Sequence, residues 1–248
     1  MHTKRPFIMS IAGFDPSGGA GLLADIKTFE QLKVQGLGVC TAITIQTADR
    51  CVSLKWEPLE EISSAINVLM NNYIIDVVKI GIVKDAEFLT KIIKTIKLNN
   101  PKAKIIWDPV LKSTSEFSFF NLNTISELKN VLNQIHLITP NFNEYKILDQ
   151  NHLFENPENS CSILIKGGHR KNKIGTDILT KKREEIFIGP NNISAVVYPK
   201  HGSGCVLSSA IAAYFAKGQN IENACRKGKL YIEKFLTSNP TLLGFHSN

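Results

Sequence analysis

The alternation of short apolar runs with helix-like stretches is the feature of this chain that most constrains its fold. Runs rich in Val and Ile alternate with longer stretches whose apolar residues recur at helical spacing. The expected strands are Phe7–Ala12, Val39–Thr47, Val77–Val83, Lys104–Val110, His136–Thr139 and Ser162–Lys166. The expected helices between them are Gly21–Val34, Glu60–Tyr73, Glu87–Lys97 and Ile125–Leu132. Strands that are apolar almost throughout, separated by helices, predict an α/β fold with a mostly parallel central sheet and helices on both faces.

The pattern changes after Gly168. Shorter β-like pieces follow, which we expect to form antiparallel strands at one side of the sheet: Asp177–Thr180, Glu185–Ile188 and Ile193–Tyr198. Two helices, Cys205–Ala216 and about Ile221–Phe235, close the chain, and the region Asn141–Asn159 is expected to form a helix followed by a loop. No linker or repeat separates these parts, and 43% of the 248 residues are apolar, so we expect one domain over residues 1–248.

Composition argues against several classes of protein. The longest stretch without Asp, Glu, Lys or Arg, His201–Ala216, is shorter than the roughly 20 residues of a membrane helix, so we expect no membrane association. The five cysteines are odd in number and form no CxxC pair, which indicates a cytoplasmic protein without a disulfide framework or zinc site. The net charge of +7 is scattered and no recognition motif accompanies it, so we expect no nucleic-acid partner.

The first candidate binding segment is the loop of small residues Ala12–Gly21. Ligands of open α/β sheets bind outside the carboxyl ends of the parallel strands, and this loop follows the first of them. Its glycines, Gly13 among them, allow the backbone to approach a ligand, and Asp25, about one helical turn further on, can reach back toward it. The alternative is a tight turn with Asp25 on a solvated face. No GK[ST] follows, so phosphate binding is not expected here.

Gln46 is the second candidate, because it interrupts an apolar pattern near the carboxyl end of the strand Val39–Thr47. Its amide offers both a donor and an acceptor, so it can read the edge of a heterocycle. The alternative is a strand-end side chain that bonds to nearby backbone.

Oxygen-bearing side chains form the third candidate, because they follow two successive expected strands. Asp108, with Val110 beside it, follows one strand, and Asn141 and Glu144 follow the next. Such oxygen ligands suit Mg²⁺, which keeps several waters and bridges substrate phosphates. The alternative is structural, with Asn141 as a helix N-cap after Pro140 and Glu144 completing a capping box.

The fourth candidate is the segment Lys200–Ala210, which carries the strongest signal. Gly202, Ser203 and Gly204 at a helix start aim backbone N–H groups and the positive end of the helix dipole at one point, which predicts an anion hole. The same field should stabilise the thiolate of Cys205 on the first helical turn. The alternative is a buried structural cysteine.

Taken together, these segments resemble the ribokinase-like superfamily, and within it the hydroxymethylpyrimidine/phosphomethylpyrimidine kinases of thiamine biosynthesis. The resemblance covers almost the whole chain. The matching segments are Ala12–Gly21, Ala24–Phe29, Thr41–Thr44 with Gln46, Lys79–Gly81, Asp108–Val110, Ile138–Asn141 with Glu144, Lys166–His169 and His201–Cys205. Many sugar kinases of the superfamily carry Asp where this chain has Cys205, and the cysteine is typical of the pyrimidine branch.

The resemblance implies a three-layer sandwich, a homodimer and a set of site residues. The pyrimidine would contact Gly13, Asp25, Gln46 and Val110. The ATP phosphates would lie over Lys166, Gly202, Ser203, Gly204 and Cys205, with Mg²⁺ near Asp108, Asn141 and Glu144. Cys205 would be the general base for an ATP-dependent phosphorylation of 4-amino-5-hydroxymethyl-2-methylpyrimidine, and the monophosphate would be the second substrate.

Two other functions remain open. A pyridoxal or pyridoxine kinase would share this arrangement, since the pyrimidine and pyridine branches of the superfamily are alike. A catalytically silent homologue would bind the pyrimidine or ATP without turning it over, against which the presence of Asp108, Lys166 and Cys205 speaks.

Overall fold

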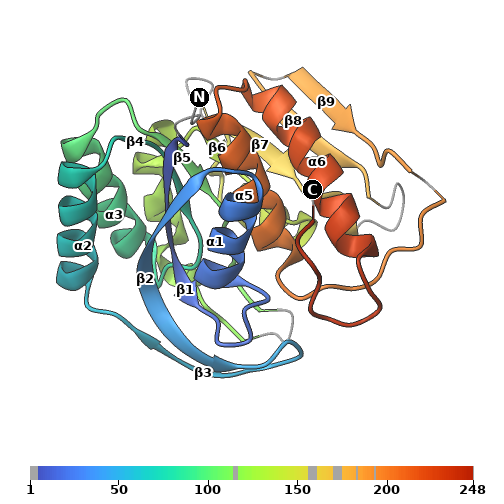
Figure 1. Ribbon diagram of the computed structural model, residues 1–248. Coiled ribbons are helices and arrows are strands. Elements are labelled where there is room, and N and C mark those ends of the chain that lie inside the picture. The colour runs from blue at the N-terminus through green and yellow to red at the C-terminus, as the bar shows by residue number, and fades with distance from the viewer. Residues whose placement is uncertain are drawn as a thin grey trace.

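The computed structural model describes residues 5–113, 117–155, 161–169, 175–182, 184–192 and 194–247. Its centre is a nine-stranded sheet of order β3-β2-β1-β4-β5-β6-β7-β8-β9 (Figure 1). The strands are β1 (Phe7–Phe14), β2 (Gln35–Gln46), β3 (Cys51–Trp56), β4 (Ile75–Ile80), β5 (Lys104–Trp107), β6 (Leu137–Ile138), β7 (Ser162–Ile165), β8 (Asp177–Lys181) and β9 (Glu184–Ile188). The six strands in the middle of this order pair in parallel, while β3 at one edge and β8 and β9 at the other are antiparallel.

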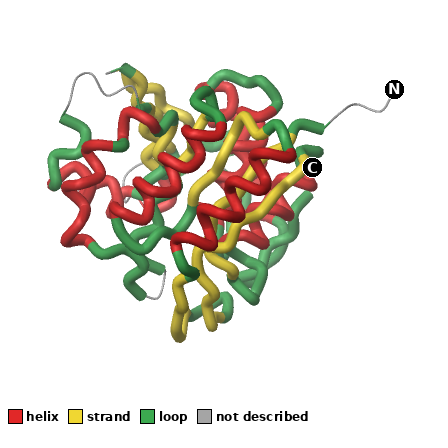
Figure 2. The backbone as a smooth tube through the Cα atoms, turned by 90° about the vertical axis from the view of Figure 1, so that its left-hand side faces the viewer, coloured by secondary structure: helices red, strands yellow, loops and turns green. Residues whose placement is uncertain are grey.

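Helices cover both faces of the sheet, which confirms the expected three-layer arrangement (Figures 1 and 2). One face packs against α2 (Leu59–Asn72), α3 (Ala86–Asn99) and the 3-10 segment η1 (Leu122–Asn130). The other packs against α1 (Gly21–Gln31), α5 (Ser203–Ala216) and α6 (Ile221–Thr237). The remaining elements are α4 (Phe142–Gln150) and the short 3-10 turns η2 (Leu132–Gln134) and η3 (Gly167–His169). None of the helices within the described ranges has the length and apolar character that crossing a membrane requires.

Three expectations about elements were wrong. The strand β3 was not expected, because an edge strand that leaves Val52, Ser53 and Lys55 exposed has no buried face for a pattern to report. The expected helix Ile125–Leu132 is 3-10 instead, in a stretch flanked by asparagines whose side chains compete for backbone groups, as Asn121 does when it accepts from the N–H of Asn123.

The third wrong expectation is the strand Ile193–Tyr198. Ile193 lies outside the described residues, and residues 194–198 join no sheet; the N–H of Tyr198 donates instead to the carbonyl of Leu236 on α6. Part of the loop expected after α4, residues 156–159, also lies outside the described residues.

Candidate active site

The carboxyl ends of the parallel strands open into a cavity of about 270 Å³. Every site residue expected from the sequence lines this cavity except Asp25. The lining residues among them are Gly13, Gln46, Asp108, Val110, Asn141, Glu144, Lys166, Gly202, Ser203, Gly204 and Cys205. Parallel strands bring segments that are far apart in the sequence to one edge of the sheet, and this edge collects nearly all of the predicted chemistry.

An open helix N-terminus forms one wall of the cavity. Gly202 is the N-cap of α5 with φ of +70°, and no side chain caps the helix. A Cβ at this position would lie 2.0 Å from the carbonyl oxygen of Gly19, so only glycine fits. The first amide that bonds back into the helix is that of Val206, to the Gly202 carbonyl. The N–H groups before it are those that a helix leaves for an anion.

Cys205 lies on the first turn of α5 and lines the cavity, but the expectation of a stabilised thiolate was wrong. Burial raises the pKa of the Cys205 thiol to about 11; the positive charge of Lys79 opposes this, while Asp108 and Asp25 add to it. Desolvation depends on how the strands and helices pack around the sulfur, which no local motif reports. The free protein therefore carries a protonated thiol near neutral pH.

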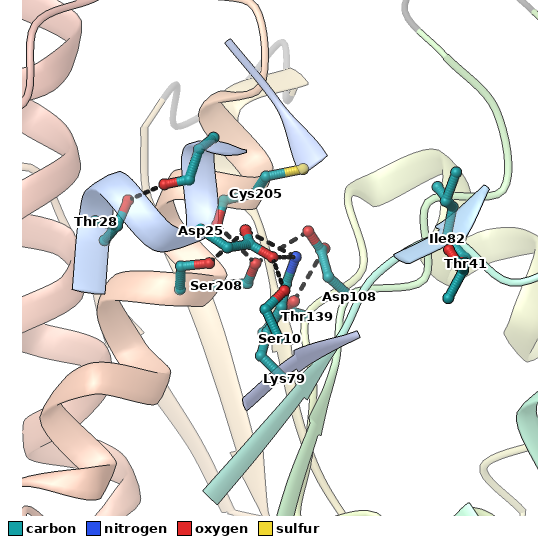
Figure 3. A network of polar contacts seen from close by, with 12 residues as sticks. Ser10, Asp25, Thr28, Thr41, Lys79, Ile82, Asp108, Thr139, Cys205 and Ser208 are labelled. Atoms are coloured by element: carbon teal, nitrogen blue, oxygen red, sulfur yellow. Dashed lines mark hydrogen bonds and ion pairs between the residues drawn. The ribbon is translucent and has the colours of Figure 1, made fainter. Parts of the chain in front are cut away.

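Asp25 does not line the cavity, in contrast to the expected contact with the pyrimidine. The buried face of α1 turns its carboxylate under the cavity floor, where Lys79 of β4 donates to both of its oxygens at 2.9 and 3.1 Å. Ser10 and Ser209 also donate to Asp25, at 2.5 and 2.6 Å. Within the described residues, the side-chain hydrogen bonds to Asp25 thus come from buried groups (Figure 3). Lys79, and not Asp25, lines the cavity.

Asp108 anchors a second buried ion pair. Lys166, which follows β7, donates to Asp108 at 2.7 Å, and Thr139 and Ser208 donate at 3.0 and 3.1 Å. Burial raises the pKa of Asp108, but Lys166 and Lys79 lower it below its usual range, so the carboxylate stays ionised. A Cβ on Gly204 would lie 3.1 Å from Lys166 Nζ, which places the ammonium directly beside the open helix N-terminus.

Asn141 and Glu144 form the capping box that the structural alternative described. The Asn141 side chain accepts from the N–H of Glu144 at 2.9 Å, and Glu144 accepts from the N–H of Asn141 at 2.7 Å. Burial raises the pKa of Glu144 to about 7, with Lys166 opposing and Asp108 adding to the rise.

The donor set fits Mg²⁺ in only one way. The Asn141 oxygen is already taken up by two backbone N–H groups, and the described residues contain no cluster of three or more His, Cys, Asp or Glu side chains suited to a metal. Asp108 and Glu144 both line the cavity. Two carboxylates with an open side match a Mg²⁺ that completes its shell with water and phosphate oxygens, rather than an all-protein cage.

Gly13, Gln46 and Val110 form a further part of the cavity wall. A Cβ on Gly13 would lie 2.4 Å from the side chain of Ile82, so the glycine keeps this wall open. The amide of Gln46 makes no side-chain hydrogen bond within the part of the chain that the structure describes. The alternative of a strand-end residue satisfied by its own backbone therefore has no support in the geometry.

Two pairs of oppositely charged or hydrogen-bonded side chains that line the cavity were not predicted from the sequence. His201 Nε2 lies 2.9 Å from Asp15, which joins the Ala12–Gly21 loop to the start of α5. Burial raises the pKa of Asp15, but hydrogen bonds from His201 and Ser17 lower it to about 2. The backbone N–H of His201 also donates to the carbonyl of Leu242 at 2.9 Å, so the C-terminal segment supports this junction from outside.

The other missed pair is Asp177 and Lys229, which lie 3.2 Å apart and both line the cavity. Asp177 also accepts from the N–H of Gly167 at 2.7 Å. A lysine within an apolar element, such as Lys79 in β4, is a sequence signal for a buried pair, because lysine is almost never fully buried without a partner. Lys229 lies among other charged residues of α6, so no such signal marks it.

Comparison with known proteins identifies the family. The chain matches the phosphomethylpyrimidine kinase family over residues 15–247. It is 30% identical over 246 residues to a hydroxymethylpyrimidine/phosphomethylpyrimidine kinase of Aquifex aeolicus, covering 94% of this chain and 95% of that protein. A protein of the same description from Saccharomyces cerevisiae is 31% identical over 94% of this chain, which spans 46% of the yeast protein's length.

Solved structures agree with this family match. The phosphomethylpyrimidine kinase of Clostridium difficile 630 has a TM-score of 0.72 at 28% identity, covering 93% of this chain and 99% of that one. A Bacillus subtilis pyridoxal kinase in an ADP complex has a TM-score of 0.80 at 23% identity over 95% of this chain and 93% of that one, a likeness of fold alone. The ribokinase-like fold is thereby confirmed, and the chain belongs to the phosphomethylpyrimidine kinase family.

Proposed function

We propose that this chain transfers the γ-phosphoryl group of ATP to the hydroxyl of 4-amino-5-hydroxymethyl-2-methylpyrimidine, and then phosphorylates the monophosphate, as a step of thiamine biosynthesis. The observation that carries the proposal is one shared cavity, lined both by the open N-terminus of α5 and by the amide of Gln46, which has no hydrogen-bond partner among the described residues. An anion-binding end and a heterocycle-reading end in one space suit a kinase of a small ring alcohol.

Phosphoryl transfer needs little from a protein beyond positioning and charge stabilisation. The N–H groups at Gly202–Cys205 and the ammonium of Lys166 would hold the ATP phosphates. When bound, Mg²⁺ neutralises phosphate charge, and Asp108 and Glu144 would hold it directly or through water. The alcohol oxygen attacks the γ-phosphorus, the bond to the bridging oxygen of ADP breaks, and the thiolate form of Cys205 takes the alcohol proton.

Product analysis by mass tests the proposal. The chain is incubated with ATP, Mg²⁺ and the pyrimidine alcohol, and in parallel with pyridoxal. We expect the pyrimidine monophosphate and then the diphosphate. Phosphorylation of pyridoxal alone would make the chain a pyridoxal kinase, and binding without any product would make it a silent homologue.

Gln46→Leu should weaken binding of the pyrimidine selectively. Leucine leaves ring nitrogens of the bound substrate without a partner, which costs about 1–3 kcal/mol. The KM for the pyrimidine should rise about tenfold or more, while the KM for ATP stays close to that of the parent protein. Gln35→Leu is the matched control, because Gln35 is an exposed residue at the other end of the same strand. Equal changes in both KM values would remove Gln46 from the pyrimidine wall.

Glu144→Gln should raise the Mg²⁺ concentration needed for half-maximal rate. The carboxylate has a pKa of about 7, so in the parent protein it gains its charge as the pH rises from 6 to 8, and the Mg²⁺ requirement should fall over that interval. Glutamine removes the charge and with it this pH dependence. Glu87→Gln, a surface change in the first turn of α3, is the control. A lower melting temperature with an unchanged Mg²⁺ titration would show that Glu144 is a helix cap only.

A second copy of the chain is the partner that we propose besides the pyrimidine. The arm formed by β2 and β3 turns Thr44 and Gln46 toward the cavity and leaves Ile43 and Ile45 49% and 64% exposed. Burial of such side chains in a homodimer would remove apolar surface from water. Sedimentation that gives only a monomer would refute it. We further propose a cytoplasmic location, in keeping with five cysteines that form no disulfide.

A further inference from the structure

The ion pair of Asp25 and Lys79 has no part in the mechanism described so far. Neither side chain is exposed at all. Burial raises the pKa of Asp25, and the charge of Lys79 with the hydrogen bonds from Lys79, Ser10 and Ser209 offsets this rise only in part. Burial lowers the pKa of Lys79, but Asp25, together with Cys205 and Asp108, raises it above its usual range, so the ammonium stays charged. Removing two charges from water is costly, and hydrophobic residues would fill the same space at no such cost.

The pair is tied to the helix that carries Cys205. Ser209, which donates to Asp25 at 2.6 Å, lies four positions after Cys205 on α5, and Ser208, three positions after it, donates to Asp108. Residues three and four apart share one face of a helix. The face of α5 that bears Cys205 is therefore fixed on two buried carboxylates (Figure 3). Each of these carboxylates holds a lysine, Lys79 at Asp25 and Lys166 at Asp108.

The charges that act on Cys205 come from several different elements. They are Asp25 on α1, Lys79 on β4, Asp108 after β5 and Lys166 after β7, with Glu144 on α4 next to Lys166. Lys79 is the strongest of the groups that favour a negative sulfur, whereas Asp25 and Asp108 disfavour it. Gly81 keeps space for the Lys79 ammonium, because a Cβ there would lie 3.3 Å from Nζ.

We propose that Asp25 and Lys79 are a positioning pair for Cys205, which fix the first turns of α5 against β1 and β4 and hold a positive charge facing the sulfur. The inference rests on the proposed function, because the sulfur meets the acceptor hydroxyl only there. It assigns Asp25 a role without substrate contact, and it makes Lys79 a residue that acts on the reaction through Cys205.

The test is the rate at which iodoacetamide alkylates Cys205 in the free protein at pH 9, followed by mass spectrometry of the peptide that contains it. Only the thiolate reacts, so the rate reports the charge on the sulfur. Lys79→Met should slow alkylation about tenfold, which corresponds to a rise of one pKa unit. Asp25→Asn should accelerate it, and the double variant should return close to the parent rate.

Opposite signs separate this role from a merely structural one, because loosened packing would accelerate alkylation in every variant. Lys229→Met is the matched control, since it also removes a cavity-lining lysine of a buried ion pair but not one of the charges that act on Cys205, and it should leave the rate at Cys205 unchanged. Where Lys79→Met does not fold, the double variant is compared with Asp25→Asn, and the ammonium should account for about a tenfold difference.

Changes of the same sign in Lys79→Met and Asp25→Asn, or no change in the folded variants, would overturn the proposal. Alkylation needs neither ATP nor pyrimidine, so its outcome is independent of the product analysis. If the two variants shift the alkylation rate in opposite directions but the protein makes no product, the proposed function is refuted and the charge effect on Cys205 is supported. Product formation without these shifts would remove only the positioning pair.

Discussion

Cys205→Ala is expected to slow phosphorylation of the pyrimidine alcohol by about a hundredfold or more, which is the usual contribution of a general base. The N–H groups of the α5 N-terminus remain, so the KM for ATP should change little. Phosphorylation of the monophosphate should suffer less, because that acceptor already carries its negative charge. Steady-state rates with the two acceptors, measured side by side, give the comparison.

The pH dependence of the same reaction is a second test of Cys205 as the general base. With a thiol pKa of about 11, the thiolate fraction grows about tenfold per pH unit from pH 7 to 10, and kcat/KM for the alcohol should rise with it. Cys205→Asp should lose this slope, because a carboxylate is ionised throughout. Cys225→Ala, a core cysteine on α6 away from the cavity, should lower stability and keep the slope. Near-normal turnover in Cys205→Ala would show that Cys205 is not the general base.

Gly202→Ala is expected to lower kcat by about a hundredfold to a thousandfold, the range seen when preorganised donors are lost. The added methyl group would lie 2.0 Å from the Gly19 carbonyl at a backbone φ of +70°, so the loop must move and carry the open N–H groups with it. Both acceptors should be affected equally, since the phosphate donor is the same in both reactions. Turnover of each acceptor and the KM for ATP are the measurements.

Gly218→Ala controls for backbone strain. Gly218 follows the same helix with φ of +85° and has no neighbour within 4 Å of a built Cβ, so it shares the strain without the collision. It should lower the melting temperature by a few degrees and leave turnover intact. If Gly202→Ala did no more than Gly218→Ala, the α5 N-terminus would not be the phosphate site.

The sheet was predictable because its signal is local. Apolar runs such as Val77–Ile80 report burial on both faces of a strand wherever they occur. The arm strand β3 has no such signal, since half of its side chains face solvent. The clustering of Asp108, Lys166 and Cys205 followed from the rule that ligand sites lie at the carboxyl ends of strands.

Other parts of the site depend on packing that no segment reveals by itself. The direction in which the Asp25 side chain points depends on the elements against which α1 packs. The pKa of Cys205 depends on how completely the surrounding elements exclude water. His201 and Asp15 are 186 positions apart, and neither residue's neighbours in sequence indicate the other. Long-range pairs of this kind were therefore beyond the sequence interpretation.

The junction of Asp15, His201 and Leu242 can form only late in the synthesis of the chain. Proteins are synthesised from the N-terminus, so the loop that begins after β1 leaves the ribosome long before its partners exist. His201 reaches Asp15 only after most of the sheet has been made, and Leu242 follows later still. A nascent chain can thus pair β1 to β7 while this junction beside the N-terminus of α5 is still open, and the rim of the cavity closes only when the last segments of the chain have been made.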